Sequence, residues 1–117
     1  MQIKKVGIIG AGQMGNGIAH VCAVAGFEVG LNDVSQARID AGLATINGTL
    51  TRQVRSGRLT EAGREAALKR IRGVPSYDGF AGYDLVIESA VEDEQVKRKI
   101  FQALCPHLKP DCIVGSN

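Results

Sequence analysis

The stretch VGIIGAGQMGNGIAH, residues 6–20, begins as an apolar run, breaks into glycines and then resumes with helical periodicity. Residues 6–9 have the composition of a short strand that is buried on both faces of a parallel sheet. Over residues 17–25 the apolar positions recur on one helix face, and Gly26 is typical of a helix end. Residues 27–31 predict a second strand. These segments therefore predict one strand–helix–strand unit.

The glycines between the first strand and the helix fit the pattern G-x-G-x-x-G. Gly10 allows a tight turn, Gly12 lets a pyrophosphate approach the backbone, and Gly15 lets the helix pack on the strand. The amides and positive dipole end of the helix N-terminus favour phosphates. The pattern predicts a dinucleotide site formed by Gly10, Ala11, Gly12, Gln13, Met14 and Gly15. A glycine turn without a ligand is the alternative that the pattern alone leaves open.

Asp33 supports the dinucleotide interpretation. It stands at the end of the second predicted strand, where a carboxylate accepts hydrogen bonds from both ribose hydroxyls of adenosine. Its negative charge would repel the 2′-phosphate of NADP, and the nearest arginine along the chain is Arg38. The predicted cofactor is therefore NAD. The alternative is that Asp33 caps a helix that begins near Ser35.

Residues 35–72 predict a helical arm. An apolar stripe predicts one long helix that ends near Gly57, and Thr60 caps a second helix, so that the two form an antiparallel hairpin. The arm is longer than a crossover between strands needs, and part of it is expected to project from the sheet. Gly42 and Gly48 are unfavourable inside the first helix and are expected to mark close packing.

The remaining residues continue the alternation of strands and helices. A third strand is predicted from Val74, a fourth over residues 85–87 and a fifth over 112–114. A helix over residues 92–104 is expected to bury an apolar face that includes Val96. The chain is therefore predicted to be one α/β domain, residues 1–117, with a doubly wound parallel sheet.

Composition limits the function further. Fourteen basic and 12 acidic residues give a net charge of +2, which offers no argument for nucleic-acid binding. The three cysteines are odd in number and have no C-x-x-C spacing, so we expect neither a metal site nor a disulfide framework. We see no secretory signal and no apolar stretch long enough to span a membrane. These features predict a cytoplasmic protein that is short for a complete two-substrate enzyme.

Several motifs together resemble the NAD-binding domain of 3-hydroxyacyl-CoA dehydrogenases, with bacterial 3-hydroxybutyryl-CoA dehydrogenases as the most similar type. They are GAGQMGNGIAH, the LND that ends the second strand, the long arm, DLVIESAVEDEQVK and the final SN. The resemblance covers the whole chain and implies a Rossmann domain that lacks its last strands. It also implies an NAD-dependent oxidoreductase of fatty-acid or butanoate metabolism that converts L-3-hydroxyacyl-CoA to 3-oxoacyl-CoA.

The resemblance also implies roles for residues beyond the glycine turn. Glu92 and Lys97 match the family's residues near the ribose and nicotinamide of the cofactor, although a solvated pair is the alternative. Thr49 falls at the position of a hydroxyl that contacts coenzyme A. Ser56 stands where some relatives carry lysine, so the basic role is assigned to Arg52 or Arg55, which are otherwise surface charges. Asn117 is expected to border the reacting centre.

The family's catalytic His–Glu pair has no counterpart in this sequence, and no catalytic residue is assigned. His20 and His107 are expected to be structural or exposed. The full-length protein is expected to be a homodimer that binds an acyl-CoA. Two alternatives stay open: the NAD-binding module of another hydroxyacid dehydrogenase, and a nucleotide-binding fragment without catalysis.

Overall fold

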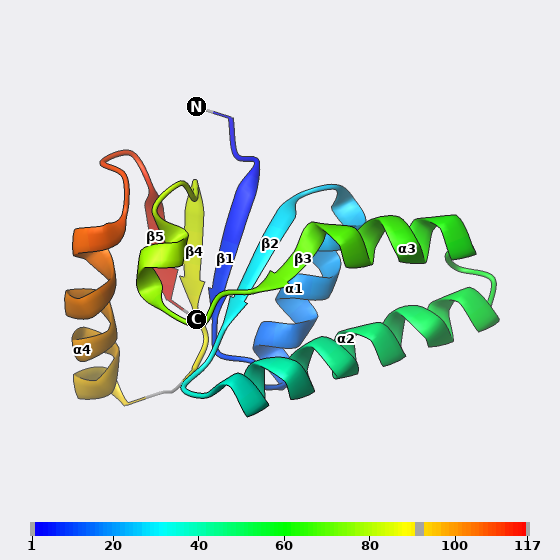
Figure 1. Ribbon diagram of the computed structural model, residues 1–117, viewed down its shortest axis with the longest axis horizontal. Helices are drawn as coiled ribbons and strands as arrows, with labels where there is room; N and C mark the ends of the chain where they lie inside the picture. Colours follow the sequence, from blue (N-terminus) through cyan, green and yellow to red (C-terminus); the bar gives the residue numbers. More distant parts are fainter. Residues whose placement is uncertain (1, 91–92, 117) are drawn as a thin grey trace.

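The computed structural model describes residues 2–90 and 93–116. Its strands form a five-stranded sheet in the order β3-β2-β1-β4-β5, and every pairing is parallel (Figure 1). The strands are β1 (Lys5–Ile9), β2 (Glu28–Asn32), β3 (Ile71–Gly73), β4 (Leu85–Glu88) and β5 (Ile113–Ser116). The helices are α1 (Gln13–Ala25), α2 (Gln36–Arg55), α3 (Glu61–Arg70) and α4 (Glu94–Leu104), with 3₁₀ turns η1 (Tyr77–Phe80) and η2 (Cys105–His107). The predicted doubly wound parallel sheet is confirmed.

Two apolar clusters cover the two faces of the sheet. On one face, Val6 and Ile8 of β1 pack with buried residues of α1, α2 and α3. On the other, Ile9 of β1 packs with Phe80, Tyr83 and the α4 residue Leu104. Because side chains alternate along a strand, one short apolar strand supplies both clusters. The centre of the sheet is therefore buried from both sides, which holds the carboxyl ends of β1 and β4 in place.

The connection from β3 to β4 is short, and two aromatic rings take the place of a covering helix. Phe80 and Tyr83 meet edge to face, with ring centroids 5.0 Å apart. A Cβ added at Gly7 in β1 would lie 2.7 Å from the Phe80 ring, and one added at Gly30 in β2 would lie 2.4 Å from the Tyr83 hydroxyl oxygen. The two strand glycines thus let both rings lie directly on the sheet.

The third strand differs from its prediction. It spans Ile71–Gly73, whereas the sequence pattern placed its start at Val74 and gave the preceding residues to a helix end. The Val74 amide still donates to the Leu31 carbonyl at 2.8 Å, but Pro75 has no amide to continue the pairing. Ile71 already has extended backbone angles, and Arg72 pairs with Gly30 of β2. Arg72 therefore belongs to the strand and not to the end of the preceding helix.

The helical arm formed by α2 and α3 is confirmed, and its far end extends beyond the sheet (Figure 1). Thr60 caps α3 as predicted, because its hydroxyl accepts a hydrogen bond from the Gly63 amide at 2.9 Å. Close packing is confirmed at Gly42, where an added Cβ would lie 2.9 Å from the Ala11 Cβ. The prediction of close packing is wrong for Gly48, where the atom nearest to an added Cβ is the end of the Arg52 side chain at 3.8 Å.

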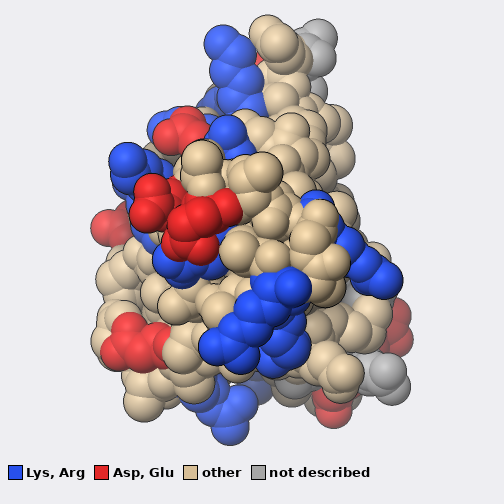
Figure 2. Space-filling model, turned by 90° about the vertical axis from the view of Figure 1, so that its right-hand side faces the viewer, with Lys and Arg blue, Asp and Glu red and all other residues tan. Residues whose placement is uncertain are grey.

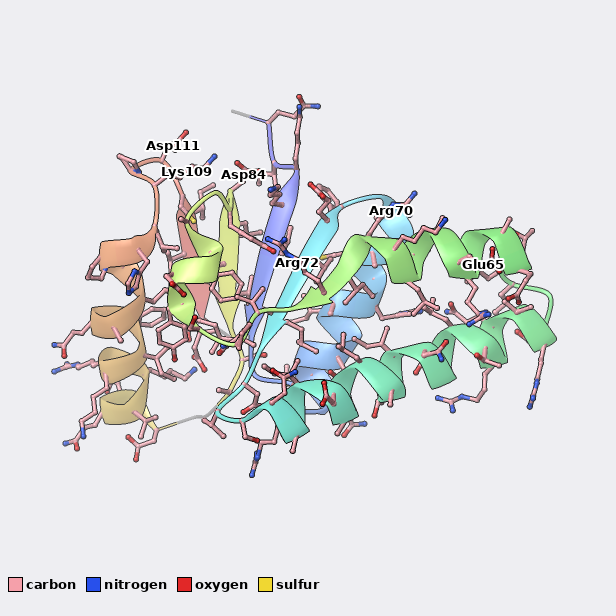
Figure 3. All side chains as sticks on the ribbon, in the orientation of Figure 1. Glu65, Arg70, Arg72, Asp84, Lys109 and Asp111 are labelled. Atoms are coloured by element: carbon pink, nitrogen blue, oxygen red, sulfur yellow. The ribbon has the colours of Figure 1, made fainter. Side chains whose placement is uncertain are left out.

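Asp84 ties together the amino ends of the central strands. Its carboxylate accepts hydrogen bonds from the backbone amides of Lys4, at 2.8 Å, and Lys5, at 2.9 Å. It also forms an ion pair with Lys109, which lies on the connection between α4 and β5 (Figure 3). The hydrogen bond from Lys109, followed by those from the two amides, holds the pKa of Asp84 well below its usual range.

Among residues 2–90 and 93–116, no helix is both long and apolar enough to cross a membrane. The same residues contain no group of three or more histidine, cysteine or acidic side chains placed to hold a metal ion.

Candidate functional site

A cleft of about 400 Å³ opens at the carboxyl ends of β1, β2 and β4. The sheet order changes direction between β1 and β4, and ligands of open α/β sheets bind in the crevice at such a point. The cleft is lined by Ile9, Gly10, Asn32, Asp33, Val34, Pro75, Ser76, Tyr77, Ala90, Val96 and Ile100. Among the residues predicted from the sequence to bind the cofactor, Gly10 and Asp33 therefore lie on its wall.

At Gly10 and Gly15 the glycine turn has the geometry that was predicted for these two glycines. Gly10 has a φ of 110°, in the left-handed region that favours glycine, and its amide donates to the Asn32 carbonyl at 2.8 Å. A Cβ at Gly15 would lie 1.8 Å from the Gly10 carbonyl oxygen, so α1 packs directly on the turn. A Cβ at Gly12 would meet nothing within 4 Å. The turn is therefore closed at Gly10 and Gly15 and open at Gly12.

The N-terminus of α1 is arranged to receive an anion. The helix begins at Gln13, four residues before the predicted start, so that Gln13 and Met14 belong to its first turn. Its N-cap is Gly12, which has no side chain to bond the first amides, and the first turn contains no acidic residue. A helix N-terminus of this kind carries partial positive charge toward the open side of the turn.

Asp33 connects the end of β2 to the glycine turn. Its carboxylate accepts hydrogen bonds from the Ala11 amide at 2.8 Å and from the Val34 amide at 2.6 Å. The cap of α2 is instead Ser35, whose hydroxyl accepts from the Arg38 amide at 3.2 Å. The interpretation of Asp33 as a helix cap is therefore wrong. The two amides orient the carboxylate at the edge of the cleft.

Glu88, which the sequence analysis missed, anchors the other side of the site. This fully buried residue ends β4, and its carboxylate accepts from the Ala90 amide at 2.6 Å and lies 3.2 Å from the Lys97 ammonium. Lys97 also donates to the Ser116 hydroxyl at 2.8 Å, which donates to Glu88 at 3.3 Å. Lys97 is thus largely buried and ion-paired with Glu88 rather than solvated, as the alternative interpretation had it. The predicted site residue Glu92 lies outside the described residues.

A signal for Glu88 was present in the sequence. Like Asp33, it is an acidic residue at the carboxyl end of a buried strand, and the ends of parallel strands meet at one edge of the sheet. Val96 was also misplaced: it was expected on the buried face of α4, but it is 40% exposed and lines the cleft.

Tyr77 lines the cleft and was not identified by the sequence analysis. Its ring is half-buried between the cleft and the apolar cluster that contains Ile100. Burial raises the pKa of the Tyr77 phenol, and the negative charges of Glu88 and Asp33 raise it further. The phenol is therefore neutral at physiological pH and lies within electrostatic range of both carboxylates.

The arm residues that the resemblance assigned to coenzyme A lie on α2, away from the cleft lining. Thr49 accepts a hydrogen bond from the Arg52 guanidinium at 3.2 Å and donates to the Thr45 carbonyl at 3.2 Å. Arg55 is exposed in the last turn of the helix. Figure 2, seen from the side of the arm, shows basic side chains in several separate groups. Asn117 lies outside the described residues.

The histidines lie away from the cleft lining. The Nε2 atom of His20 lies 2.9 Å from the Gln53 side-chain oxygen, in a contact between α1 and α2. His107 ends η2.

Comparison with known proteins gives a consistent result. The family model described as 3-hydroxyacyl-CoA dehydrogenase, NAD binding domain, matches residues 5–117. A 3-hydroxybutyryl-CoA dehydrogenase of Bradyrhizobium diazoefficiens is 61% identical over 115 residues, which are 98% of this chain and 39% of that protein. A probable 3-hydroxybutyryl-CoA dehydrogenase of Deinococcus radiodurans is 42% identical, over 97% of this chain and 40% of that protein.

Solved structures agree with these relatives. The (S)-3-hydroxybutyryl-CoA dehydrogenase PaaH1 from Ralstonia eutropha superimposes with a TM-score of 0.95 at 43% identity, over 99% of this chain and 41% of that one. FadB2 of M. tuberculosis superimposes with a TM-score of 0.97 at 42% identity, over 100% of this chain and 41% of that one. The chain thus spans about two fifths of the length of these four relatives.

Proposed function

This chain belongs to the 3-hydroxyacyl-CoA dehydrogenase family as its NAD-binding domain, and from this premise we propose that it supplies the cofactor half of an enzyme oxidising L-3-hydroxyacyl-CoA to 3-oxoacyl-CoA. The observation that carries the proposal is the cleft at the switch between β1 and β4, with Gly10 of the glycine turn and Asp33 on its wall. The relatives named 3-hydroxybutyryl-CoA dehydrogenase favour a short acyl chain.

The residues present fit a dinucleotide. The open side of Gly12 and the N-terminus of α1 would hold the pyrophosphate, because backbone amides there face an approach that no side chain occupies. Val34, which is 86% exposed, and Val96 offer apolar surface at the cleft for a flat base. When bound, the nicotinamide accepts the hydride that leaves C3 of the substrate.

Asp33 would select NAD over NADP. The amides of Ala11 and Val34 each donate to the carboxylate, which keeps it oriented and leaves further acceptor capacity for two ribose hydroxyls. A 2′-phosphate at the same place would meet a fixed negative charge.

Lys97 would bind on the nicotinamide side of the cofactor. Glu88 holds the ammonium of Lys97 at the end of β4, so that its position is set before the cofactor arrives. On the arm, Thr49, Arg52 and Arg55 would contact the coenzyme A portion of the substrate. We assign none of the 117 residues to proton transfer.

The proposal is tested by titrating the protein with NADH and NADPH while following nicotinamide fluorescence. We expect the wild type to prefer NADH over NADPH. Asp33→Ala should lose NADH affinity by at least about tenfold, because it removes one or more charge-assisted hydrogen bonds. Asp40→Ala is the matched control, because Asp40 is exposed on α2 and its carboxylate accepts a hydrogen bond from the neighbouring Gln36 side chain. Equal affinity of Asp33→Ala and wild type for NADH would contradict the proposed ribose contact.

The acyl-CoA half has its own test. Measured in the complete enzyme, Arg52→Gln and Arg55→Gln should each raise the KM for 3-hydroxybutyryl-CoA while the Kd for NADH stays unchanged. An unchanged KM in the double variant would overturn the assignment of the arm and leave the cofactor site intact.

A further inference from the structure

A second cluster of charged side chains lies at the opposite end of the sheet, around a pocket of about 50 Å³ at the amino ends of β1 and β2. Its lining consists of Lys5, Glu28, Val29, Lys69, Arg70, Arg72 and Tyr83. Figure 3 shows Arg70 and Arg72 near the junction of α3 and β3, away from the carboxyl ends of the strands. Four basic side chains thus share a pocket with one carboxylate.

The structure brings these cations together without pairing them. Arg70 donates to the Ala23 carbonyl at the end of α1 at 2.8 Å, a neutral acceptor that fixes its side chain. Lys5 and Arg72 each lie 5.9 Å from the centroid of the Tyr83 ring. In the part of the chain that the structure describes, none of the four basic residues forms an ion pair. Like charges that line one pocket repel one another, and a bound anion would relieve the repulsion.

Tyr83 gives the pocket a buried polar wall. Its side chain is only 2% exposed, and its hydroxyl accepts a hydrogen bond from the Arg72 Nε at 3.3 Å. A hydroxyl that accepts in this way keeps its own proton to donate. The hydroxyl fits only because Gly30 lies beneath it. The donor is therefore fixed in place by the packing of the sheet.

We propose that this pocket binds a single phosphoryl group. Its volume suits one such group, and its donors come from three segments of the chain: the planar guanidinium of Arg72 on β3, the ammonium of Lys5 on β1 and the phenol of Tyr83 before β4. A tetrahedral phosphoryl group has an oxygen for each direction, whereas a carboxylate has only two oxygens. The site is separate from the dinucleotide cleft, and the proposal does not depend on the proposed function.

The test is a titration of the ¹⁵N-labelled protein with inorganic phosphate in the presence of saturating NADH, which keeps phosphate out of the dinucleotide cleft. Potassium chloride at equal ionic strength is the reference. We expect saturable amide shifts at Gly30, Arg72 and Tyr83 with phosphate and not with chloride. A response to phosphate no larger than the response to chloride would overturn the proposal.

Three variants locate the binding. Arg72→Gln should weaken phosphate binding by about tenfold or more, as expected for a charge-assisted hydrogen bond. Tyr83→Phe keeps the buried ring and should weaken it severalfold. Arg58→Gln removes the same charge at an exposed position next to the turn of the arm and should have no effect. Equal weakening by Arg72→Gln and Arg58→Gln would show general charge attraction and overturn the site.

A parallel titration with glycerol 3-phosphate identifies the source of the group. Equal affinity for the ester and the free ion supports recognition of the phosphoryl group alone, and tighter binding of the ester supports a phosphorylated metabolite. All variants should retain NADH affinity, which separates this result from any failure at the dinucleotide cleft.

Discussion

Asp33 and Asp84 perform the same local task at opposite ends of the sheet with different outcomes. Each accepts hydrogen bonds from two backbone amides and so ties a strand end to a neighbouring segment. Asp84 also has Lys109 as a fixed ion-pair partner, whereas Asp33 lies at the edge of an open cleft. The difference teaches that a carboxylate can bind a ligand when the fold orients it but leaves some of its hydrogen-bond acceptor positions open.

At the carboxyl ends of the strands, the largest loss of stability is expected from a substitution at Gly15. Gly15→Ala places a methyl group 1.8 Å from the Gly10 carbonyl oxygen, where only a backbone shift can make room. We expect a loss of at least about 3 kcal/mol in the free energy of unfolding, at the upper end of overpacking effects. Urea denaturation followed by circular dichroism measures it.

Gly17→Ala in the same helix is the control for this substitution. Nothing lies within 4 Å of a Cβ at Gly17, and alanine is favoured over glycine in a helix by about 0.5–1 kcal/mol. This variant should be slightly more stable than the wild type. If both variants lost stability alike, close packing at the turn would not be the cause.

At the amino ends of the strands, the stability of the domain should depend on Asp84. Asp84→Asn removes the ion pair with Lys109 and the negative charge that the two amides share. We expect a clear fall in Tm by calorimetry together with an unchanged Kd for NADH, because the tie and the cleft lie at opposite ends of the strands. A large loss of NADH affinity would mean that the two edges are coupled.

The pH dependence of stability sharpens the same contrast. The pKa of Asp84 is lowered in the folded state, so its contribution is fully present above the unfolded pKa of about 4 and is lost as the pH falls toward the folded value. Urea unfolding at a series of pH values from 6 to 3 should therefore show stability falling with pH. In Asp84→Asn this slope should be shallower, and an equal slope would assign the acid sensitivity to other carboxylates.

The smallest effect on stability is expected for Asp33→Asn. The amide oxygen of asparagine can still accept from the Ala11 amide, and the exposed Val34 amide that loses its acceptor can bond water, so the free energy of unfolding should change by less than about 1 kcal/mol. The same variant should lose NADH affinity and preference over NADPH. A stability loss as large as that of Asp84→Asn would show that Asp33 is a structural tie as well.

The sequence predicted the parts of this molecule that are encoded over short distances. The glycine turn, Asp33 at the end of β2 and the Thr60 cap each depend on neighbours within a few residues or within one strand–helix–strand unit. The same is true of the arm, whose apolar stripe repeats along one helix.

The missed features depend on contacts between distant parts of the chain. Asp84 bonds amides 79 and 80 residues away. The position of Glu88 at the end of a strand could be read from the sequence, but its hydrogen bond with Ser116 on the edge strand could not. The third strand was misplaced because Arg72 resembles a basic helix end until its pairing with Gly30 is known. Local pattern contains no information on such pairings.

The aromatic rings that rest on Gly7 and Gly30 also set limits on how this domain can be redesigned or diverge. A strand glycine leaves the space that the ring above it fills, so an alanine in place of Gly7 would be accepted only together with a smaller side chain in place of Phe80. These two positions are 73 residues apart in the numbering and should nevertheless change together. Single substitutions would therefore understate the range of residues that each position tolerates. A library of variants that changes both positions at once would show the full range.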